Sequence, residues 1–308
     1  MTNKSQHTKI IKEEAIRLGF SSVGIAKANF LHEESPRLEK WLKKGYQGQM
    51  SYLKNYFDER LDPRLLVENA KSIISLSFNY YPEKEQVDNT YKIARYAYGK
   101  DYHKILKKKG KTLIQFIQEK IGDVNARFFV DSAPVMERTW AVKSGLGWIG
   151  KNGLLLQKKA GSYFFLAELI IDLELNYNKP FKTNHCGQCT KCIDACPTQA
   201  ILDNAVLDAS KCISYLTIEL KESIPETFKS QYQNWIFGCD ICQEVCPWNS
   251  FSLPHLEKSF YPNENLITKS KNDWENLSEE NFNNLFQSSA LKRTGYKGLK
   301  RNIEFLKS

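Results

Sequence analysis

The cysteine-rich stretch "HCGQCTKCIDACPTQA", residues 185–200, is the most informative part of this sequence. It has the order Cys-x2-Cys-x2-Cys-x3-Cys-Pro, the spacing with which bacterial ferredoxins bind iron–sulfur clusters. Three thiolates on one tight loop hold a first cluster, and the fourth, on the following helix, points toward a second. The stretch therefore predicts two clusters, and its cysteines are Cys186, Cys189, Cys192 and Cys196.

A shorter run, "GCDICQEVCPWN" at residues 238–249, repeats the pattern without its first cysteine. Cys212, in "DASKCISYL", is the remaining cysteine and can supply the missing ligand. Two four-iron clusters with four thiolates each require all eight cysteines of the chain. We assign Cys186, Cys189, Cys192 and Cys246 to the first cluster, and Cys196, Cys212, Cys239 and Cys242 to the second.

Zinc is the alternative, because Cys-x2-Cys pairs also build structural zinc sites. A third cysteine two residues on, and a closing Cys-Pro in both runs, favour iron–sulfur clusters. Such clusters transfer single electrons, so the electron acceptor is to be sought in the cysteine-free residues 1–185.

Composition limits the class of protein. No apolar run reaches the roughly 18 residues of a membrane-spanning helix, and the N-terminus lacks the apolar region of a signal peptide. We therefore expect a cytoplasmic protein without membrane contact, in a compartment where thiols stay reduced and metal binding is favoured over disulfides. The net charge of +9 is compatible with a polyanionic partner such as RNA and does not establish one.

Helical and strand patterns alternate over residues 1–178, which predicts an α/β domain. A mainly α ferredoxin-like domain with the two clusters is expected at 179–250, and a polar, basic extension that packs on the core at 251–308. Within the first domain we expect a helix over 101–122, interrupted at Gly110. The other expected helices are 5–20, 35–46 and 135–145, and the expected strands are 21–28, 71–82, 126–134 and 162–175.

The segment "GLGWIG", residues 145–150, matches the G-x-G-x-x-G pattern of dinucleotide-binding loops. Those loops follow a strand and precede a helix, whereas here a helical segment precedes and no helix signal follows. We therefore expect this glycine-rich loop to pack against some other large flat ligand.

Asp131 ends the strand pattern "RFFVDSAP", a position where reacting groups often lie. A carboxyl group there could donate a proton if burial raises its pKa, and it could equally be the N-cap of a helix that begins near Val135. The nearby "DYHKIL", residues 101–106, has Leu106 where the Asp-x-His-x-x-Gly motif of cobalamin ligation requires glycine. His103 is then more simply a structural residue.

Seven stretches, in this order, resemble the epoxyqueuosine reductase family, whose members use cobalamin and iron–sulfur clusters to complete queuosine in tRNA. They are "RLDPRLLVENAKSII" (60–74), "RYAYGKDYH" (95–103), "VDSAPVMERTWAVKSGLGWIGKN" (130–152), "GSYFFLAEL" (161–169), "CGQCTKCIDACPTQAI" (186–201), "CISYLTIE" (212–219) and "GCDICQEVCPWN" (238–249).

The resemblance implies a base-off cobalamin bound to the α/β domain without a lower histidine ligand, which agrees with the failed Asp-x-His-x-x-Gly match. Two clusters would deliver electrons to it, and Asp131 would be the catalytic acid that protonates the epoxide oxygen. The residues implied in cobalamin binding are Arg60, Ala94, Tyr98, Asp101, Tyr102, His103, Asp131, Ile149, Gly150, Lys151, Asn152 and Gly153.

Basic side chains at two places are expected to contact tRNA, although each group also fits a solvated surface. Many family members continue into a C-terminal helical-repeat domain, whereas this sequence stops at Ser308, so the core and its basic tail would hold the RNA. We further expect a monomer that takes electrons from an unidentified donor. The residues expected at the RNA are Lys107, Lys108, Lys109, Lys292, Arg293, Lys297, Lys300 and Arg301.

Two other functions fit part of the sequence. A reductase of a small molecule, like the reductive dehalogenases, would use the same cofactors, but the basic charge favours RNA and a twin-arginine signal is absent. A ferredoxin-like electron carrier without catalysis would need far fewer residues before its clusters, and it would not bind cobalamin.

Overall fold

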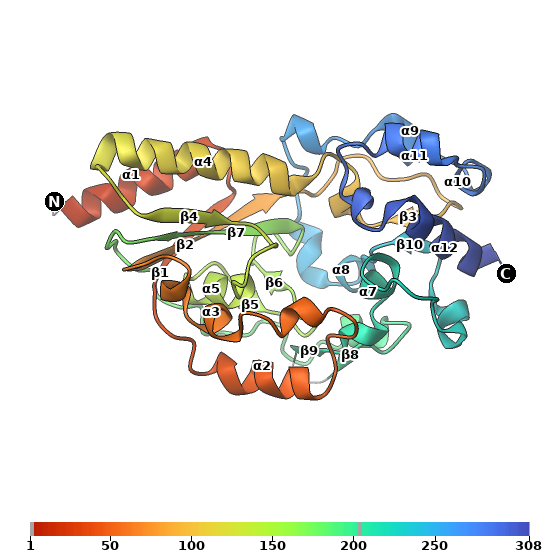
Figure 1. Cartoon of the computed structure of the whole chain (residues 1–308), viewed down its shortest axis with the longest axis horizontal. Helices are drawn as coiled ribbons and strands as arrows, with labels where there is room; N and C mark the ends of the chain where they lie inside the picture. The colour runs from red at the N-terminus through yellow and green to blue at the C-terminus, as the bar shows by residue number, and fades with distance from the viewer. Residues whose placement is uncertain (1–2, 203–204, 308) are drawn as a thin grey trace.

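A four-stranded antiparallel sheet forms the centre of the N-terminal half in the computed structural model, which describes residues 3–202 and 205–307 (Figure 1). The strand order is β1-β2-β7-β4, and every neighbouring pair is antiparallel. The strands are β1 (Ser22–Lys27), β2 (Ser72–Asn79), β7 (Phe164–Ile171) and β4 (Ala126–Phe129). The expected strands are all present, but this sheet has none of the parallel pairing that is usual where helices and strands alternate.

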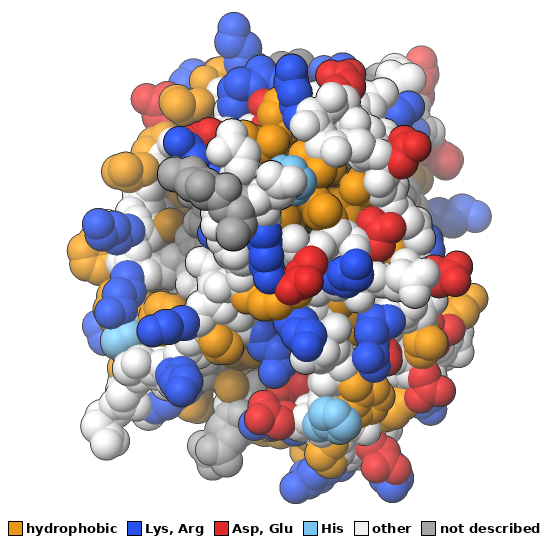
Figure 2. Space-filling view, turned by 90° about the vertical axis from the view of Figure 1, so that its left-hand side faces the viewer, with side chains coloured by type: hydrophobic (Ala, Val, Ile, Leu, Met, Phe, Trp, Pro, Cys, Tyr) orange, Lys and Arg blue, Asp and Glu red, His pale blue; other side chains and the backbone are white. Residues whose placement is uncertain are grey.

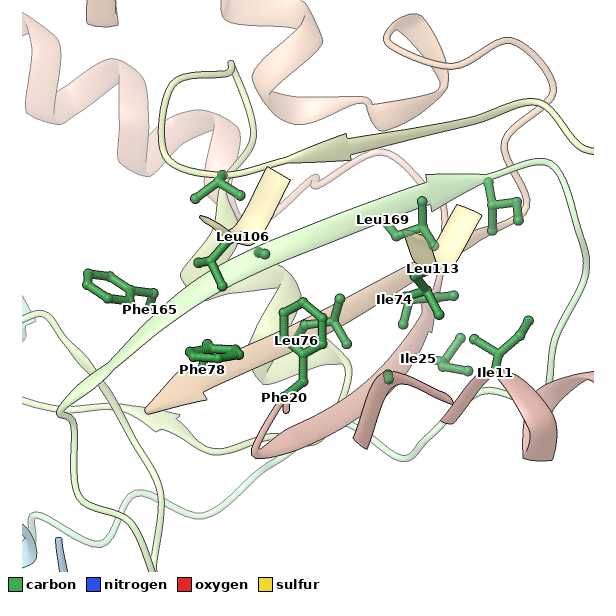
Figure 3. Close-up of a cluster of buried hydrophobic side chains, with 14 of the residues drawn as sticks. Ile11, Phe20, Ile25, Ile74, Leu76, Phe78, Leu106, Leu113, Phe165 and Leu169 are labelled. Carbon is green, nitrogen blue, oxygen red and sulfur yellow. The ribbon is translucent and has the colours of Figure 1, made fainter. Parts of the chain in front are cut away.

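Helices cover both faces of the sheet because its inner strands are apolar on both sides. α1 (Asn3–Arg17) and α4 (Tyr102–Ile121) lie on one face and α5 (Glu137–Lys143) on the other (Figure 1). Figure 3 shows the first interface, where Ile11 of α1 and Leu106 and Leu113 of α4 pack onto strand residues. The strand residues drawn there include Ile25, Ile74, Leu76 and Leu169.

The expected break at Gly110 is wrong, since α4 runs without interruption through that residue. Gly110 is buried, and a Cβ atom at this position would overlap the aromatic ring of Phe128 on β4. The glycine therefore lets the helix approach the sheet closely, and packing outweighs its low helix propensity.

Replacing Gly110 by alanine is expected to destabilise the fold by about 1–3 kcal/mol, because the added methyl must displace Phe128. Helix propensity alone predicts the opposite sign, since alanine is favoured over glycine by about 1 kcal/mol within a helix. Urea unfolding of the variant, beside Lys108→Ala at an exposed position of the same helix, measures the difference. A stabilised Gly110→Ala protein would show that the close approach is unimportant.

Short elements carry the cysteines. α6 (Lys191–Asp194) contains Cys192, α8 (Ile241–Glu244) contains Cys242, and the two helices contact each other. α7 (Ile213–Ile218) begins directly after Cys212. The remaining strands here are β8 (Ile201–Leu202), β9 (Val206–Leu207) and β10 (Trp235–Phe237).

The last part of the chain packs against segments that are distant in sequence. β10 pairs in parallel with β3 (Lys92–Ile93), and buried residues of both strands join a hydrophobic cluster with the C-terminal helices. Trp274 is at its centre and is fully buried. These helices are α9 (Glu264–Ile267), α10 (Lys271–Glu275), α11 (Glu279–Leu285) and α12 (Gly295–Lys307).

Two short helices and one hairpin complete the N-terminal half of the chain. α2 (Glu34–Lys43) and α3 (Phe57–Leu61) precede β2, and the hairpin strands β5 (Trp148–Ile149) and β6 (Leu155–Leu156) follow α5. No helix in the described part of the chain combines the length and apolar character needed to cross a membrane.

Candidate active site and cluster-binding segments

Asp131 lies two residues beyond the end of β4, in a left-handed backbone conformation with φ of 55°. Its carboxylate Oδ2 accepts a hydrogen bond from Tyr102 Oη at 2.7 Å and lies 3.2 Å from His103 Nε2. It is not a helix N-cap, because α5 begins at Glu137 and has Met136 in the N-cap position. The structure thus brings together three residues that the resemblance implied, from two segments of the chain.

His103 lies between two carboxylates. Its Nδ1 is 2.8 Å from Asp101 Oδ1, on the side away from Asp131, and Asp101 is also the N-cap of α4. Burial lowers the pKa of His103, but the hydrogen bonds and charges of the two aspartates outweigh it and raise this pKa to about 9. The hydrogen bonds from His103 and Tyr102 hold the pKa of Asp131 below its usual value.

At neutral pH the structure therefore has an imidazolium between two carboxylates. The aromatic ring of Tyr102 is fixed beside it, stacked on Phe165 with ring centroids 4.0 Å apart and on His103 at 4.1 Å. Burial and the charge of Asp131 raise the pKa of Tyr102, so this phenol keeps its proton. The group holds two exchangeable protons beside a carboxylate whose side chain is 58% exposed.

Titration of His103 tests this electrostatic picture. The pKa is raised from 6.5, so the stabilisation from its ion pairs is fully present below pH 6.5 and is lost as the pH rises through about 9. In an NMR titration of ¹⁵N-histidine protein, assigned with His103→Gln, we expect a midpoint near 9 that falls when Asp131 is changed to asparagine. A midpoint at or below 6.5 would contradict the paired arrangement.

Two side chains that sequence reasoning did not connect with Asp131 lie within electrostatic reach of it. Burial and the charges of Glu219 and Asp131 raise the pKa of Tyr52, and the positive charge of Arg293 contributes to the low pKa of Asp131. Arg293 forms an ion pair with Glu219, with Nε to Oε1 at 2.5 Å. Arg293 was expected at the RNA only, and local sequence carries no signal for this convergence.

The turn between β5 and β6, residues 150–153, connects the cysteine segments with α5. Lys151 Nζ donates to the carbonyl oxygen of Cys189 at 2.9 Å, and Asn152 Nδ2 donates to that of Cys242 at 3.4 Å. On the other side, the guanidinium of Arg138 donates to the carbonyl oxygen of Gly153. The turn is therefore held between the thiol-bearing loops and the segment that follows Asp131.

The glycines of "GLGWIG" pack against the protein itself. A Cβ atom at Gly147 would overlap the carbonyl oxygen of Leu156, and one at Gly150 would lie 2.6 Å from a methyl group of Leu156. A Cβ at Gly145 would be 2.7 Å from the carbonyl oxygen of Lys179. The close packing that we expected against a flat ligand is thus made within the chain.

The other residues expected at cobalamin occupy different surroundings. Arg60 donates to the carbonyl oxygens of Tyr52 and Asn55, at 3.1 and 3.2 Å, and Ile149 is half-buried in β5. Ala94 and Tyr98 are buried in hydrophobic clusters, so their side chains do not join Asp131.

The thiols of the first predicted set surround one small cavity of about 40 Å³, together with Lys151, Lys191 and Trp248. Burial raises the pKa of Cys192, and three neighbouring thiols add to the rise: Cys186, Cys246 and Cys189.

The thiols of the second set also influence one another, and all eight cysteines are partly buried. Burial raises the pKa of Cys239, and the nearby thiols of Cys212 and Cys242 raise it further. Cys196 likewise raises the pKa of Cys212, and Cys192 of the first set raises that of Cys242. The two sets of thiols therefore lie next to each other.

Several basic residues expected at the RNA have partners within the chain. Arg301 donates to the carbonyl oxygens of Leu216, Leu220 and Glu222, and Lys300 to that of Glu275. Lys109 pairs with Glu257 at 3.0 Å. Those left exposed are Lys107, Lys108, Lys292, Arg293 and Lys297.

Positive charge is not gathered into one patch on the face that Figure 2 shows. Lys and Arg side chains there are interspersed with Asp, Glu and apolar groups. Net charge alone therefore does not locate an RNA-binding surface on this face.

Comparison with known protein families gives matches to the cysteine segments and to the segment that contains Asp131. Residues 185–249 match the model of the 4Fe-4S double cluster binding domain, and residues 60–132 match that of epoxyqueuosine reductase QueG, DUF1730. The chain thus carries a double-cluster iron–sulfur domain, and the cluster alternative is favoured over zinc.

Relatives cover the whole chain. It is 61% identical over 307 residues to the epoxyqueuosine reductase of Cellulophaga algicola, covering 100% of both chains. An epoxyqueuosine reductase crystallised with an epoxyqueuosine-modified tRNA-Tyr stem loop superposes with a TM-score of 0.91 at 29% identity, over 98% of this chain and 80% of that one. The Bacillus subtilis epoxyqueuosine reductase, solved with its catalytic aspartate loop swung out of the active site, gives a TM-score of 0.89 at 29% identity, covering 98% and 81%. The chain therefore belongs to the epoxyqueuosine reductase family.

Proposed function

We propose that this protein reduces epoxyqueuosine in tRNA to queuosine, with electrons supplied through two four-iron clusters and cobalamin and a proton supplied at Asp131. The observation that carries the proposal is that one fold connects the Asp131 group with the cysteine segments. The turn at residues 150–153 contacts both cysteine segments and Arg138 of α5, and the neighbouring Glu137 of the same helix accepts the backbone N–H of Asp131. Family membership favours this reaction over an electron carrier or a reductase of small molecules.

The thiols suit iron–sulfur clusters chemically. Buried thiols that raise one another's pKa are difficult to ionise unless a cationic group binds them, and cluster irons supply that charge. The cavity lined by the first set supports its four ligands: Cys186, Cys189, Cys192 and Cys246. The second set would be Cys196, Cys212, Cys239 and Cys242. Because the sets adjoin, an electron could pass from one cluster to the other.

The chain also offers suitable surroundings for cobalamin, which when bound would supply the low-potential electrons that break the carbon–oxygen bonds. The turn at 150–153, Arg60 and the exposed carboxylate of Asp131 would contact it. The described histidine nearest to Asp131 is His103, which already lies between two carboxylates, and this supports a cobalamin without a lower histidine ligand. Ala94 and Tyr98 would contribute through backbone atoms alone, since their side chains are buried.

The proton chemistry can be followed in the protein's own residues. Removing the epoxide oxygen as water requires two electrons and two protons, and leaves a carbon–carbon double bond. Asp131 is ionised in the free protein, while His103 beside it holds a proton at neutral pH. As negative charge develops on the epoxide oxygen, a proton from His103 would pass through the Asp131 carboxylate to that oxygen, and solvent would supply the second proton. Tyr102 would keep the carboxylate in place.

The tRNA would approach the site from the side of Arg293, whose side chain is 53% exposed and within reach of Asp131. Lys107 also lies near the catalytic group, where its Nζ donates to Ser132 Oγ at 3.3 Å. Exposed cations near a reactive carboxylate suit a nucleotide whose phosphates flank the base to be reduced. Lys108, Lys292 and Lys297 would extend this contact.

A direct assay tests the function. The protein would be purified without oxygen, supplied with iron, sulfide and cobalamin, and desalted before iron and cobalt are measured. With a chemical reductant and an epoxyqueuosine-containing stem loop, we expect product oligonucleotide lighter by one oxygen. Full clusters with bound cobalamin but no loss of oxygen would reject the substrate. Full clusters without cobalt would favour an electron carrier.

A further inference from the structure

A second carboxyl group, from Glu137, supports the backbone of Asp131. Glu137 is the first residue of α5, and its Oε1 accepts a hydrogen bond from the backbone N–H of Asp131 at 2.5 Å. The accepted N–H belongs to the residue with the left-handed φ of 55°. A side chain six residues ahead thus binds the loop at its most strained point.

We propose that Glu137 is a positioning residue that holds the loop of residues 130–136 in the conformation that places the Asp131 carboxylate against Tyr102 and His103. A left-handed conformation is unfavourable for a non-glycine residue and persists where surrounding contacts impose it. Asp131 and Ser132 are both exposed, so apolar packing does little to restrain them. The hydrogen bond that Glu137 accepts from the Asp131 N–H ties this exposed segment to α5.

The surroundings of Glu137 suit this role. Burial and the neighbouring charge of Asp131 raise the pKa of Glu137 to about 8. Glu168 of β7 lies on the face of the sheet that α5 covers and is fully buried. Among the residues that the structure describes, neither of its carboxylate oxygens has a hydrogen-bond partner. Burial and Glu137 raise the pKa of Glu168 as well. Carboxyl groups buried so close together are expected to stay largely protonated, and a neutral carboxyl can still accept the Asp131 N–H through its carbonyl oxygen.

The first turn of α5 also binds the turn at residues 150–153. Arg138, the next residue, donates to the carbonyl oxygen of Gly153 in the turn that contacts both cysteine segments. Adjacent residues on one short helix therefore fix the loop of the proposed acid and the turn proposed to contact cobalamin. Loss of Glu137 would release the first and leave the second in place.

The test removes the acceptor while keeping the volume. In cluster-loaded Glu137→Met, we expect amide hydrogen exchange in peptides covering residues 130–136 to accelerate about 10- to 100-fold, the range for loss of a strong hydrogen bond. Turnover of the stem loop should fall by a similar factor with KM within about twofold, and iron content should be unchanged. Glu137→Gln, whose amide oxygen can accept the same bond, should restore both slow exchange and turnover.

Asp172→Ala is the matched control, because Asp172 Oδ1 accepts the backbone N–H of Asn125 at 3.0 Å just before the opposite end of β4. It should alter neither exchange at 130–136 nor turnover. Exchange in Glu137→Met equal to the wild type would overturn the proposal, as would a Gln variant as impaired as the Met variant. The turnover measurement rests on the proposed function, whereas the hydrogen-exchange measurement does not. If the wild-type protein were inactive on the stem loop, hydrogen exchange alone would decide the positioning role of Glu137.

Discussion

Asp131→Asn is expected to lower turnover of an epoxyqueuosine stem loop by about 10²- to 10⁴-fold, the usual contribution of a positioned acid. Asparagine tolerates the left-handed backbone and can still accept the hydrogen bond of Tyr102. It cannot carry a proton to the epoxide oxygen. The loss should therefore appear in turnover, while the iron content and the melting temperature stay close to those of the wild type.

Single-turnover assays, followed by mass spectrometry of the oligonucleotide, measure this effect. Asp123→Asn provides a control, since Asp123 is an exposed aspartate before β4. The pH dependence gives a second readout: the wild-type rate should fall as His103 loses its proton near pH 9, and this step should disappear in the variant. A variant as active as the wild type would remove Asp131 from the mechanism.

Cys212→Ala is expected to reduce the iron bound per chain from about eight to about four, with loss of turnover. Cys212 is the one cysteine outside the two runs, and it precedes α7 at a partly buried position near Cys239. Without its thiolate the second cluster loses a ligand that no spare cysteine can replace. The first cluster keeps all four of its proposed ligands.

Iron analysis and paramagnetic resonance of the reduced protein distinguish the two clusters. Cys192→Ala is the matched variant, since it removes a ligand of the first set and should leave a spectrum of the second cluster alone. The two variants should therefore retain different signals. Identical residual spectra, or two intact clusters in Cys212→Ala, would show that the division of ligands is wrong.

The sequence by itself determined the local features. Ligand spacing within a tight loop depends on a few consecutive residues, so the two cysteine runs could be read directly, and a family model of a double-cluster domain matches them. The two inner strands, β2 and β7, could be predicted for a similar reason, because eight-residue runs rich in β-branched and aromatic side chains favour β-structure. The function followed from a resemblance that extends along the chain, and the relatives show that family.

Tertiary structure decided what depends on packing between distant segments. The break expected at Gly110 failed because helix propensity carries no information about Phe128, which is 18 positions further along the chain. Asp131 could be read locally as a helix cap, and only the fold placed it against His103 and within reach of Arg293. Glu137 was not noticed in the sequence, since its role depends on the direction in which α5 leaves the loop. Such contacts follow from the free energy of the whole packed chain, whereas ligand spacing is a property of a few residues.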